Sequence, residues 1–239
     1  ILPKECEAIE AFMDQGCWSN KHYFGEGADG LWRYQLIEAD GSKFKIIYDA
    51  SNQTEEDTVE WRHSGLHNVT NAIAATMAAH MAGISVNQAC DALSDFIGVK
   101  RRMEVIYSDC KVTVYDDFAH HPTAIKTTLE GLRAKVGSEF ILAIIEPRSA
   151  TMRMGVHGRN LVSSVLSADQ VMWYQNSSVD WDMADLLQDA SLSCSVVNDL
   201  EKLIEMTTSS IQEKTHIVIM SNGGFEGFHR KLLKSFDHN

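Results

Sequence analysis

The sequence lacks the features that mark membrane-spanning, disulfide-bonded and nucleic-acid-binding proteins. Its longest strongly apolar run, Phe140 to Ile145, has the length of a β-strand, whereas a membrane-spanning helix needs roughly 20 such residues. The five cysteines include no C-x-x-C pair, which argues against a zinc knuckle or disulfide framework and favours a reducing cytoplasm. The 33 acidic residues outnumber the 21 basic ones, giving a formal charge of −12. Neither a membrane nor a nucleic acid is therefore expected as a partner.

Three common functional motifs are also missing. No G-x-x-x-x-G-K-[ST] run is present, so the chain has no P-loop to cradle the phosphates of ATP. Residues 25–30 match G-x-G-x-x-G in letters, but they precede a predicted hairpin rather than a helix, which argues against a dinucleotide site. The hydrolase motif G-x-S-x-G is absent. A small anionic ligand stays compatible with the acidic composition, because a few local cations and helix N-termini suffice to bind it.

The first part of the chain, up to about residue 98, reads as a mixed α+β region. Residues 6–13 predict a short helix. Two alternating apolar runs, 31–38 and 43–48, flank Asp40-Gly41 and predict a β-hairpin.

Helical spacing dominates residues 65–98. Ile73, Met77 and Met81 recur four residues apart and predict a helix with these side chains in a core. A second helix is expected to begin at Ser85, with Gln88 completing a capping box, and to end at Gly98. The two would form an antiparallel helical pair.

From about residue 103, strands and helices alternate, which predicts a parallel sheet covered by helices on both faces. The expected strands are 104–107, 111–116, 140–145, 171–174, 194–197 and 216–220. The expected helices are 122–135, 157–166, 180–187, 199–211 and 225–236. The boundary between the two parts is expected near residues 98–100.

Three polar clusters follow strands of this predicted sheet. They are 116–122 after the second strand, 146–151 after the third and 221–225 after the last. Ligands of open α/β sheets bind beyond the carboxyl ends of the strands, so all three clusters are candidates for one site. A fourth polar group, Lys100-Arg101-Arg102, lies at the boundary.

Each cluster also has a purely structural interpretation. Asp116 and Asp117 would favour the start of the following helix as caps. His120 and His121 beside them suggest a metal site, although adjacent histidines diverge and no third ligand has clear spacing. Residues 222–224 would form a turn. These alternatives stay open on the residues alone.

Three segments together resemble signatures of the Mur ligases, enzymes that use ATP to build the peptide part of the bacterial cell wall. Gly65–Ala75 resembles the family pattern G-x-H-N-x-x-N-x-x-A-A, Arg102–Glu104 resembles R-[MF]-E, and Asp117–Pro122 resembles D-Y-[AG]-H-x-P. Their order and spacing make the combination specific. Further segments resemble members of the family that join a murein tripeptide to UDP-N-acetylmuramate: Val99–Glu104, Tyr115–Ile125, Glu146–Ser149 and Met220–Phe225.

The resemblance implies a protein of three domains: a UDP-binding domain, a central P-loop ATPase domain and a C-terminal Rossmann-like domain. Residues 1–99 would be the C-terminal part of the central domain, and residues 100–239 the C-terminal domain. The expected fold class is thus α/β, with a mainly parallel six-stranded sheet preceded by an α+β remnant of the ATPase domain. The chain would be a fragment without a P-loop, so we expect it to be inactive alone.

The resemblance further implies the chemistry of peptidoglycan recycling in the bacterial cytoplasm. ATP, with Mg²⁺, would convert the carboxylate of UDP-N-acetylmuramate to an acyl phosphate, and the amine of L-Ala-γ-D-Glu-meso-diaminopimelate would attack it to form an amide. The partners would be these two substrates. The metal ligands are expected mostly outside this chain, so no metal site is assigned to it.

The nucleotide-binding residues implied by the resemblance are Asn68, Asn71, Arg102 and Asp117. The asparagine amides, Asn71 foremost, would hydrogen-bond to adenine. Arg102 would reach the nucleotide at the domain boundary, and Asp117 would accept from the ribose hydroxyls. Phe118 stands where many relatives carry Tyr.

The substrate-binding residues implied by the resemblance are His120 and Arg148, since a guanidinium grips a carboxylate well. Ser149, Arg153 and Asn222 are expected near the same substrate from their location. Thr151 stands where the L-alanine-adding relatives carry a second Arg, which favours a different incoming substrate.

Three alternatives remain beside this hypothesis. The first is a UDP-N-acetylmuramate–L-alanine ligase of the same family. The second is a non-catalytic α/β ligand-binding module. The third is a hydrolase that would use His120, His121, Asp116 and Asp117 around a metal ion.

Overall fold

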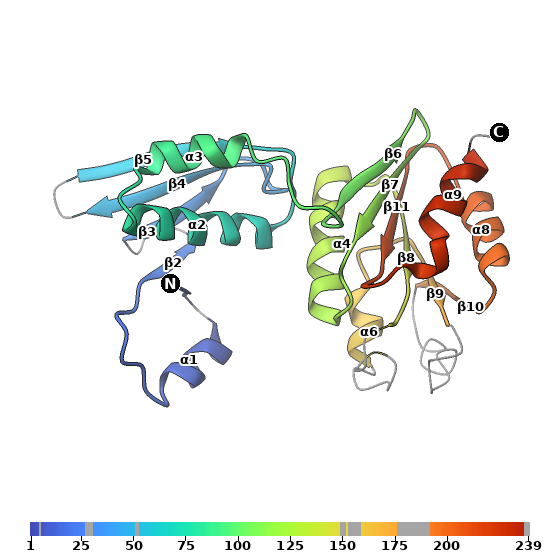
Figure 1. Ribbon diagram of the computed structural model, residues 1–239, viewed down its shortest axis with the longest axis horizontal. Helices are drawn as coiled ribbons and strands as arrows, with labels where there is room; N and C mark the ends of the chain where they lie inside the picture. The colour runs from blue at the N-terminus through green and yellow to red at the C-terminus, as the bar shows by residue number, and fades with distance from the viewer. Residues whose placement is uncertain are drawn as a thin grey trace. The chain divides into compact units, whose positions relative to one another are not determined.

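The computed structural model describes residues 1–4, 6–26, 31–50, 53–148, 152, 159–175 and 192–236. The chain divides into two compact units, Ile1–Ile97 and Gly98–Asn239, called the N-terminal and C-terminal units below (Figure 1). Ser149, Thr151 and Arg153, together with the helix expected at 180–187, lie outside the described residues. No helix of the described part is long and apolar enough to cross a membrane.

The N-terminal unit contains a five-stranded sheet in the order β1-β2-β3-β4-β5. β1, β2 and β3 pair in parallel, and β3, β4 and β5 pair antiparallel. The strands are β1 Leu2–Pro3, β2 Tyr23–Glu26, β3 Trp32–Leu36, β4 Lys43–Ala50 and β5 Gln53–Glu60. The helices are α1 Glu7–Met13, α2 Leu66–Met81 and α3 Val86–Ser94.

The expected hairpin is present as β3 and β4, in register from Trp32 opposite Tyr48 to Leu36 opposite Phe44. Asp40 closes its loop, because its carboxylate accepts hydrogen bonds from the backbone and hydroxyl of Ser42. The sequence did not indicate β5, which carries four acidic residues and buries only Val59. β5 has no apolar pattern to hold it against a core. It is held instead by its pairing with β4 and by ion pairs such as Lys45–Glu56.

Helices α2 and α3 confirm the predicted helical pair and the capping box of Ser85 and Gln88. Two details were wrong. Met81 is 60% exposed, because it is the last residue of α2 and contributes to no buried cluster, whereas Ile73 and Met77 are in the core. The second helix ends at Ser94 rather than Gly98. Phe96 therefore lies beyond the helix.

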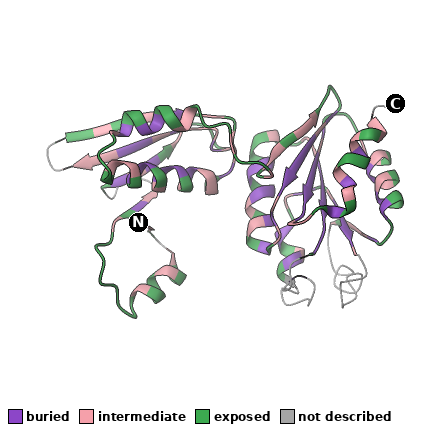
Figure 2. Cartoon of the chain, viewed as in Figure 1, coloured by how far each residue is buried: buried purple, intermediate pink, exposed green. Residues whose placement is uncertain are grey.

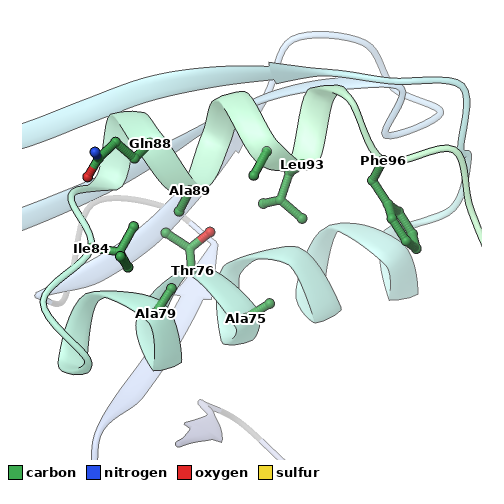
Figure 3. A pocket seen from close by; sticks show the side chains of 9 residues that line it. Ala75, Thr76, Ala79, Ile84, Gln88, Ala89, Leu93 and Phe96 are labelled. Carbon is green, nitrogen blue, oxygen red and sulfur yellow. The ribbon is translucent and has the colours of Figure 1, made fainter.

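A groove of about 360 Å³ lies between α2 and α3. Figure 3 shows it lined by small alanines, by Leu93 and Phe96, and by the hydroxyl of Thr76. That hydroxyl is buried and has no hydrogen-bond partner.

The C-terminal unit contains a six-stranded sheet in the order β10-β9-β8-β11-β7-β6. All neighbours pair in parallel except β6 and β7. The strands are β6 Glu104–Ser108, β7 Val112–Asp117, β8 Phe140–Ile145, β9 Gln170–Tyr174, β10 Ser193–Val197 and β11 Thr215–Met220. The helices are α4 Pro122–Val136, α6 Arg159–Ser164, α8 Leu200–Ser209 and α9 Phe228–Phe236, which follows a short 3₁₀ turn, Phe225–Gly227.

Helices cover this sheet on both faces, as the strand–helix alternation predicted (Figure 2). Leu129 of α4 and Leu161 of α6 belong to the core on one face. Leu203 of α8 and Leu232 of α9 belong to the core on the other. The predicted α/β class with a mainly parallel six-stranded sheet is therefore confirmed, and all six strands lie within two residues of their expected bounds.

One helix differs from its expected form. The segment 225–236 begins with Phe225 and Glu226 in left-handed backbone conformations, with φ of 44° and 47°, before α9 starts at Phe228. The apolar spacing of α9 reveals which face of the helix is buried. It does not reveal this turn, because residues other than glycine rarely adopt positive φ.

Candidate functional site

The strand register brings the three polar clusters to one edge of the C-terminal sheet. Met220 at the end of β11 pairs with Asp117 of β7 on one side and with Ile145 of β8 on the other. The segments that follow these three strands therefore start side by side, at the carboxyl edge where open α/β sheets bind ligands.

Asp117 connects the start of the unit to this edge. It is 3% exposed, and its two carboxylate oxygens accept backbone hydrogen bonds from Met103 and Ala119, each at 2.8 Å. Burial raises the pKa of Asp117, and the two backbone donors offset that rise only in part. The residues of the R-[MF]-E and D-Y-[AG]-H-x-P resemblances are thus joined directly by one side chain.

Neither aspartate caps the following helix, so that interpretation was wrong. The N-cap of α4 is His121, whose ring nitrogen accepts a hydrogen bond from the backbone of Thr123 at 3.3 Å. The Asp116 carboxylate instead contacts Arg101 before β6 and His229 beyond β11, and the Asp117 carboxylate accepts from the backbone before β6 and in the loop after β7.

Asp116 lies between two cationic or polar partners. Arg101 donates from Nε to one oxygen at 3.2 Å, and His229 of α9 lies with Nε2 3.1 Å from the other. Burial alone would raise the pKa of Asp116, but the hydrogen bonds and charges of His229 and Arg101 outweigh it and hold that pKa below its ordinary value. Arg101 also donates to the carbonyl of Ser221 at 2.6 Å.

His229 was not a candidate from the sequence. It lies 113 positions from Asp116 in the chain, in a helix whose pattern marks only Phe228 and Leu232 as buried. No spacing rule connects two residues so far apart, so only the fold reveals the pair.

Arg102 projects from the same segment and is exposed. The guanidinium carbons of Arg101 and Arg102 lie 5.3 and 5.5 Å from the ring centre of Phe118, within the range of a cation–π interaction. The backbone of Phe118 donates to the carbonyl of Arg101 at 2.8 Å. Phe118 thus serves as an aromatic support for two arginines without a phenol hydroxyl.

The loops after β8 and β11 are linked through Ser221. Its hydroxyl donates to the buried carboxylate of Glu146 at 2.5 Å and accepts from the backbone of Gly223 at 3.0 Å. The guanidinium of Arg148 lies against Gly223 so closely that a Cβ there would be 2.0 Å from Nη1. The side-chain amide oxygen Oδ1 of Asn222 is buried and has no hydrogen-bond partner. Arg148 and Asn222, two predicted substrate residues, therefore adjoin the same turn.

His120 is half-buried near Phe118, with ring centres 5.4 Å apart, and its Nδ1 lies 2.9 Å from the carbonyl of Phe118. Nδ1 is therefore the protonated nitrogen, which leaves Nε2 for a ligand. Within the described ranges no three His, Cys, Asp or Glu side chains gather as a metal site would need. The structure thus offers the metal-hydrolase alternative no donor set in those ranges.

The predicted adenine residues belong to the N-terminal unit. Asn68 uses its amide to donate to the carbonyl of Ser64 at 2.8 Å, which closes the turn before α2. Asn71 follows almost one turn later and is exposed on α2. Gly65 precedes the helix with φ of 96°, a conformation that favours glycine. Ser149 and Arg153 cannot be placed beside these residues, because they lie outside the described ranges.

Known proteins resemble this chain over most of its length. A family model described as "Mur ligase, glutamate ligase domain" matches residues 101–223. The UDP-N-acetylmuramate–L-alanyl-gamma-D-glutamyl-meso-2,6-diaminoheptandioate ligase of Haemophilus influenzae is 40% identical over 219 residues, covering 91% of this chain and 47% of that protein. The UDP-N-acetylmuramate–L-alanine ligase of Cytophaga hutchinsonii is 36% identical over 126 residues, 52% of this chain and 26% of that protein.

A solved structure agrees with these matches. The murein peptide ligase from Psychrobacter arcticus aligns with a TM-score of 0.73 and 40% identity, covering 98% of this chain and 50% of that one. The chain spans about half the length of the relatives it matches. On the family model, the shared fold and the motifs joined at the sheet edge, the chain belongs to the Mur ligase family.

Proposed function

We propose that this chain is part of an ATP-dependent ligase and serves to bind and orient its substrates. The ligase would join L-Ala-γ-D-Glu-meso-diaminopimelate to UDP-N-acetylmuramate in the bacterial cytoplasm. The observation that carries the proposal is the joining of two of the family's motifs at one sheet edge, where Asp117 holds Met103 while Arg148 and Asn222 adjoin the neighbouring turn. Two relatives that are 40% and 38% identical over 91% and 98% of this chain carry the same tripeptide in their names.

Each unit carries residues whose chemistry suits a nucleotide. Arg102 is an exposed cation beside Phe118, which suits an anionic phosphate. Asp117 accepts one backbone hydrogen bond at each oxygen, and each carboxylate oxygen retains a further lone pair for a ribose hydroxyl. In the N-terminal unit, the exposed amide of Asn71 offers both a donor and an acceptor to a base edge, with Asn68 nearby on the same helix.

ATP would supply the phosphoryl group that activates the muramyl carboxylate, and Mg²⁺ would neutralise the charge of the phosphates. Phosphoryl transfer depends mainly on positioning and charge stabilisation. The roles proposed for this chain are therefore to bind and orient. Arg102 would hold the nucleotide, and His120 and Arg148 would direct the tripeptide amine toward the acyl carbon. Phosphate leaves as the amide forms, and the amine loses a proton.

The tripeptide is favoured over free L-alanine because it carries several carboxylates. Arg148 lies exposed against Gly223, ready to meet one of them, and the buried side-chain amide oxygen of Asn222 still needs a hydrogen-bond donor. The N–H groups of a peptide supply such donors. The L-alanine ligases match with lower identity, 36% over 52% of the chain or 28% over 89% of it.

Calorimetry on the purified chain tests the proposal. We expect the tripeptide to bind and L-alanine at the same concentration to give no heat of binding. Arg148→Ala should weaken tripeptide binding about tenfold, the loss of one charge-assisted pair. Arg230→Ala, a matched change of an exposed arginine on α9, should have no effect. Equal binding of L-alanine, or equal loss in both variants, would contradict the proposal. Because the sequence has no P-loop, we expect no ATP hydrolysis by this chain.

A further inference from the structure

The segment Arg101–Met103 begins the C-terminal unit in an unfavourable backbone conformation. Arg101 and Met103 have φ of 59° and 50°, in the left-handed region that residues with a Cβ rarely adopt. Arg102, the residue to which the proposed function assigns a nucleotide contact, lies between them. Such conformations persist only where surrounding contacts fix them.

Backbone contacts account for part of the restraint. Met103 donates to Asp117, and the carbonyl of Arg101 accepts from Phe118 at 2.8 Å. The backbone of Arg101 donates to the side chain of Glu104 at 2.9 Å. These contacts fix the two ends of the segment against β6 and β7.

The side chain of Arg101 supplies the other part. It donates to Asp116 from Nε and to the carbonyl of Ser221 from Nη2, and so connects the segment to the ends of β7 and β11. Arg101 can hold this position only if the Asp116 carboxylate stays in its rotamer. A carboxylate held by a single donor group can turn about its last bond, whereas a second donor group from another element fixes it.

His229 is the closer donor at the second oxygen of Asp116, with Nε2 at 3.1 Å, whereas Nε of Arg101 lies 3.5 Å from that oxygen. It comes from α9, and its ring lies edge-on to Phe225 and Phe228, with centres 6.2 and 6.4 Å away. Its side chain is 20% exposed, so aromatic packing restrains the ring. Because Nε2 carries a proton in the hydrogen-bonded neutral ring and in the imidazolium alike, the contact does not depend on the charge of His229.

We propose that His229 is a positioning residue for Arg102, acting through Asp116 and Arg101. The C-terminal helix thereby orders the segment that presents the nucleotide-contacting arginine. The inference uses the proposed function only for the ligand of Arg102, since the ordering of 101–103 is a property of the unit itself.

Hydrogen exchange measured by NMR on the whole chain tests the ordering. The reporters are the amides of Met103 and Phe118, which donate to Asp117 and Arg101. His229→Ala should speed their exchange about tenfold, as expected for losing one hydrogen bond to a charged group. His229→Gln retains an N–H at a similar reach and should restore rates to within about twofold of the wild type.

His216→Ala is the matched control. His216 also pairs with a carboxylate, Glu139 at 2.7 Å, but near the opposite end of the same sheet, as the second residue of β11. It should lower thermal stability while leaving the Met103 and Phe118 amides within about twofold of wild type, as expected when two sites are independent. Wild-type exchange in His229→Ala, no rescue by Gln, or equal acceleration in His216→Ala would overturn the inference.

ATP affinity provides the second readout. Where the wild-type chain binds ATP, His229→Ala and Arg102→Ala should each raise the dissociation constant, about threefold and tenfold respectively, for an indirect and a direct loss of a charged contact. A His229→Ala chain with unchanged affinity beside a weakened Arg102→Ala would refute the positioning role. Absence of ATP binding by the wild type would refute the nucleotide role instead, and the exchange rates would still decide the ordering.

Discussion

The sheets of the two units differ in how far helices cover them. In the C-terminal unit, β8 and β11 bury almost every side chain, because helices pack on both faces. In the N-terminal unit, β4 alternates buried and more exposed residues over its first four positions. Large apolar side chains there stay exposed, among them Phe12, Trp18 and Ile97. The C-terminal unit therefore offers the site at its strand ends a scaffold that is buried on both faces.

The largest expected effect follows from that contrast. Leu142→Ala removes a fully buried side chain of β8 and should lower the free energy of unfolding of the C-terminal unit by about 3 kcal/mol. Phe96→Ala changes a 44% exposed ring beside the α2–α3 groove and should cost less than about 1 kcal/mol. Urea unfolding followed through NMR signals of each unit measures both. Similar losses in the two variants would remove the contrast.

A smaller effect concerns the carboxylates at the sheet edge. The pKa of Asp116 is lowered in the folded unit, so ionised Asp116 contributes stability above its unfolded pKa, and that contribution disappears as the pH falls through the folded pKa. Asp116→Asn should therefore cost about 2 kcal/mol at neutral pH. The difference from wild type should shrink below pH about 4. Urea titrations at a series of pH values measure this, and a pH-independent difference would argue against the ion pair.

Sequence patterns predicted the C-terminal unit better than the N-terminal one for a physical reason. A continuous apolar run such as Phe140–Ile145 indicates a strand that is buried on both faces of an α/β sheet. In the structure, β8 has those bounds. β5 has acidic residues in place of such a run, and pairing with β4 decides its conformation. An apolar pattern reveals only strands that are buried, whereas β5 is held mainly by its backbone pairing with β4.

The same distinction applies to the site. Resemblance to family motifs located Arg102, Asp117 and Arg148, and the strand register then placed their segments at one edge. His229 was not predicted, and the contact of Ser221 with Glu146 was not predicted although 221–225 was a candidate cluster, because the partners in both contacts are distant in the chain. The left-handed Arg101 and Met103 were not predicted either, since neither is a residue type that signals positive φ.

Two neighbouring glycines allow a still finer comparison. A Cβ at Gly223 would displace the guanidinium of Arg148, whereas a Cβ at Gly224 would meet nothing within 4 Å. Because Arg148 is flexible and exposed, Gly223→Ala should change the free energy of unfolding by less than about 1 kcal/mol. It should nevertheless weaken tripeptide binding about fivefold. Gly224→Ala is the matched control for both measurements, and equal affinities in the two variants would separate Arg148 from the substrate.

The smallest expected effect concerns an ion pair between β4 and the edge strand β5 of the N-terminal unit. Lys45→Ala removes the exposed ion pair with Glu56 and should cost less than about 0.5 kcal/mol, a loss that added salt should abolish. Thermal unfolding at low and high salt measures it. A cost that persists in high salt would show that Lys45 stabilises β5 through packing instead.

The most direct test of the account is an NMR titration of the chain with L-Ala-γ-D-Glu-meso-diaminopimelate. The account predicts saturable shifts of the Arg148, Asn222 and Gly223 amides, and no such shifts with L-alanine. Shifts confined to residues away from the carboxyl edge of the C-terminal sheet, or equal shifts with L-alanine, would contradict it.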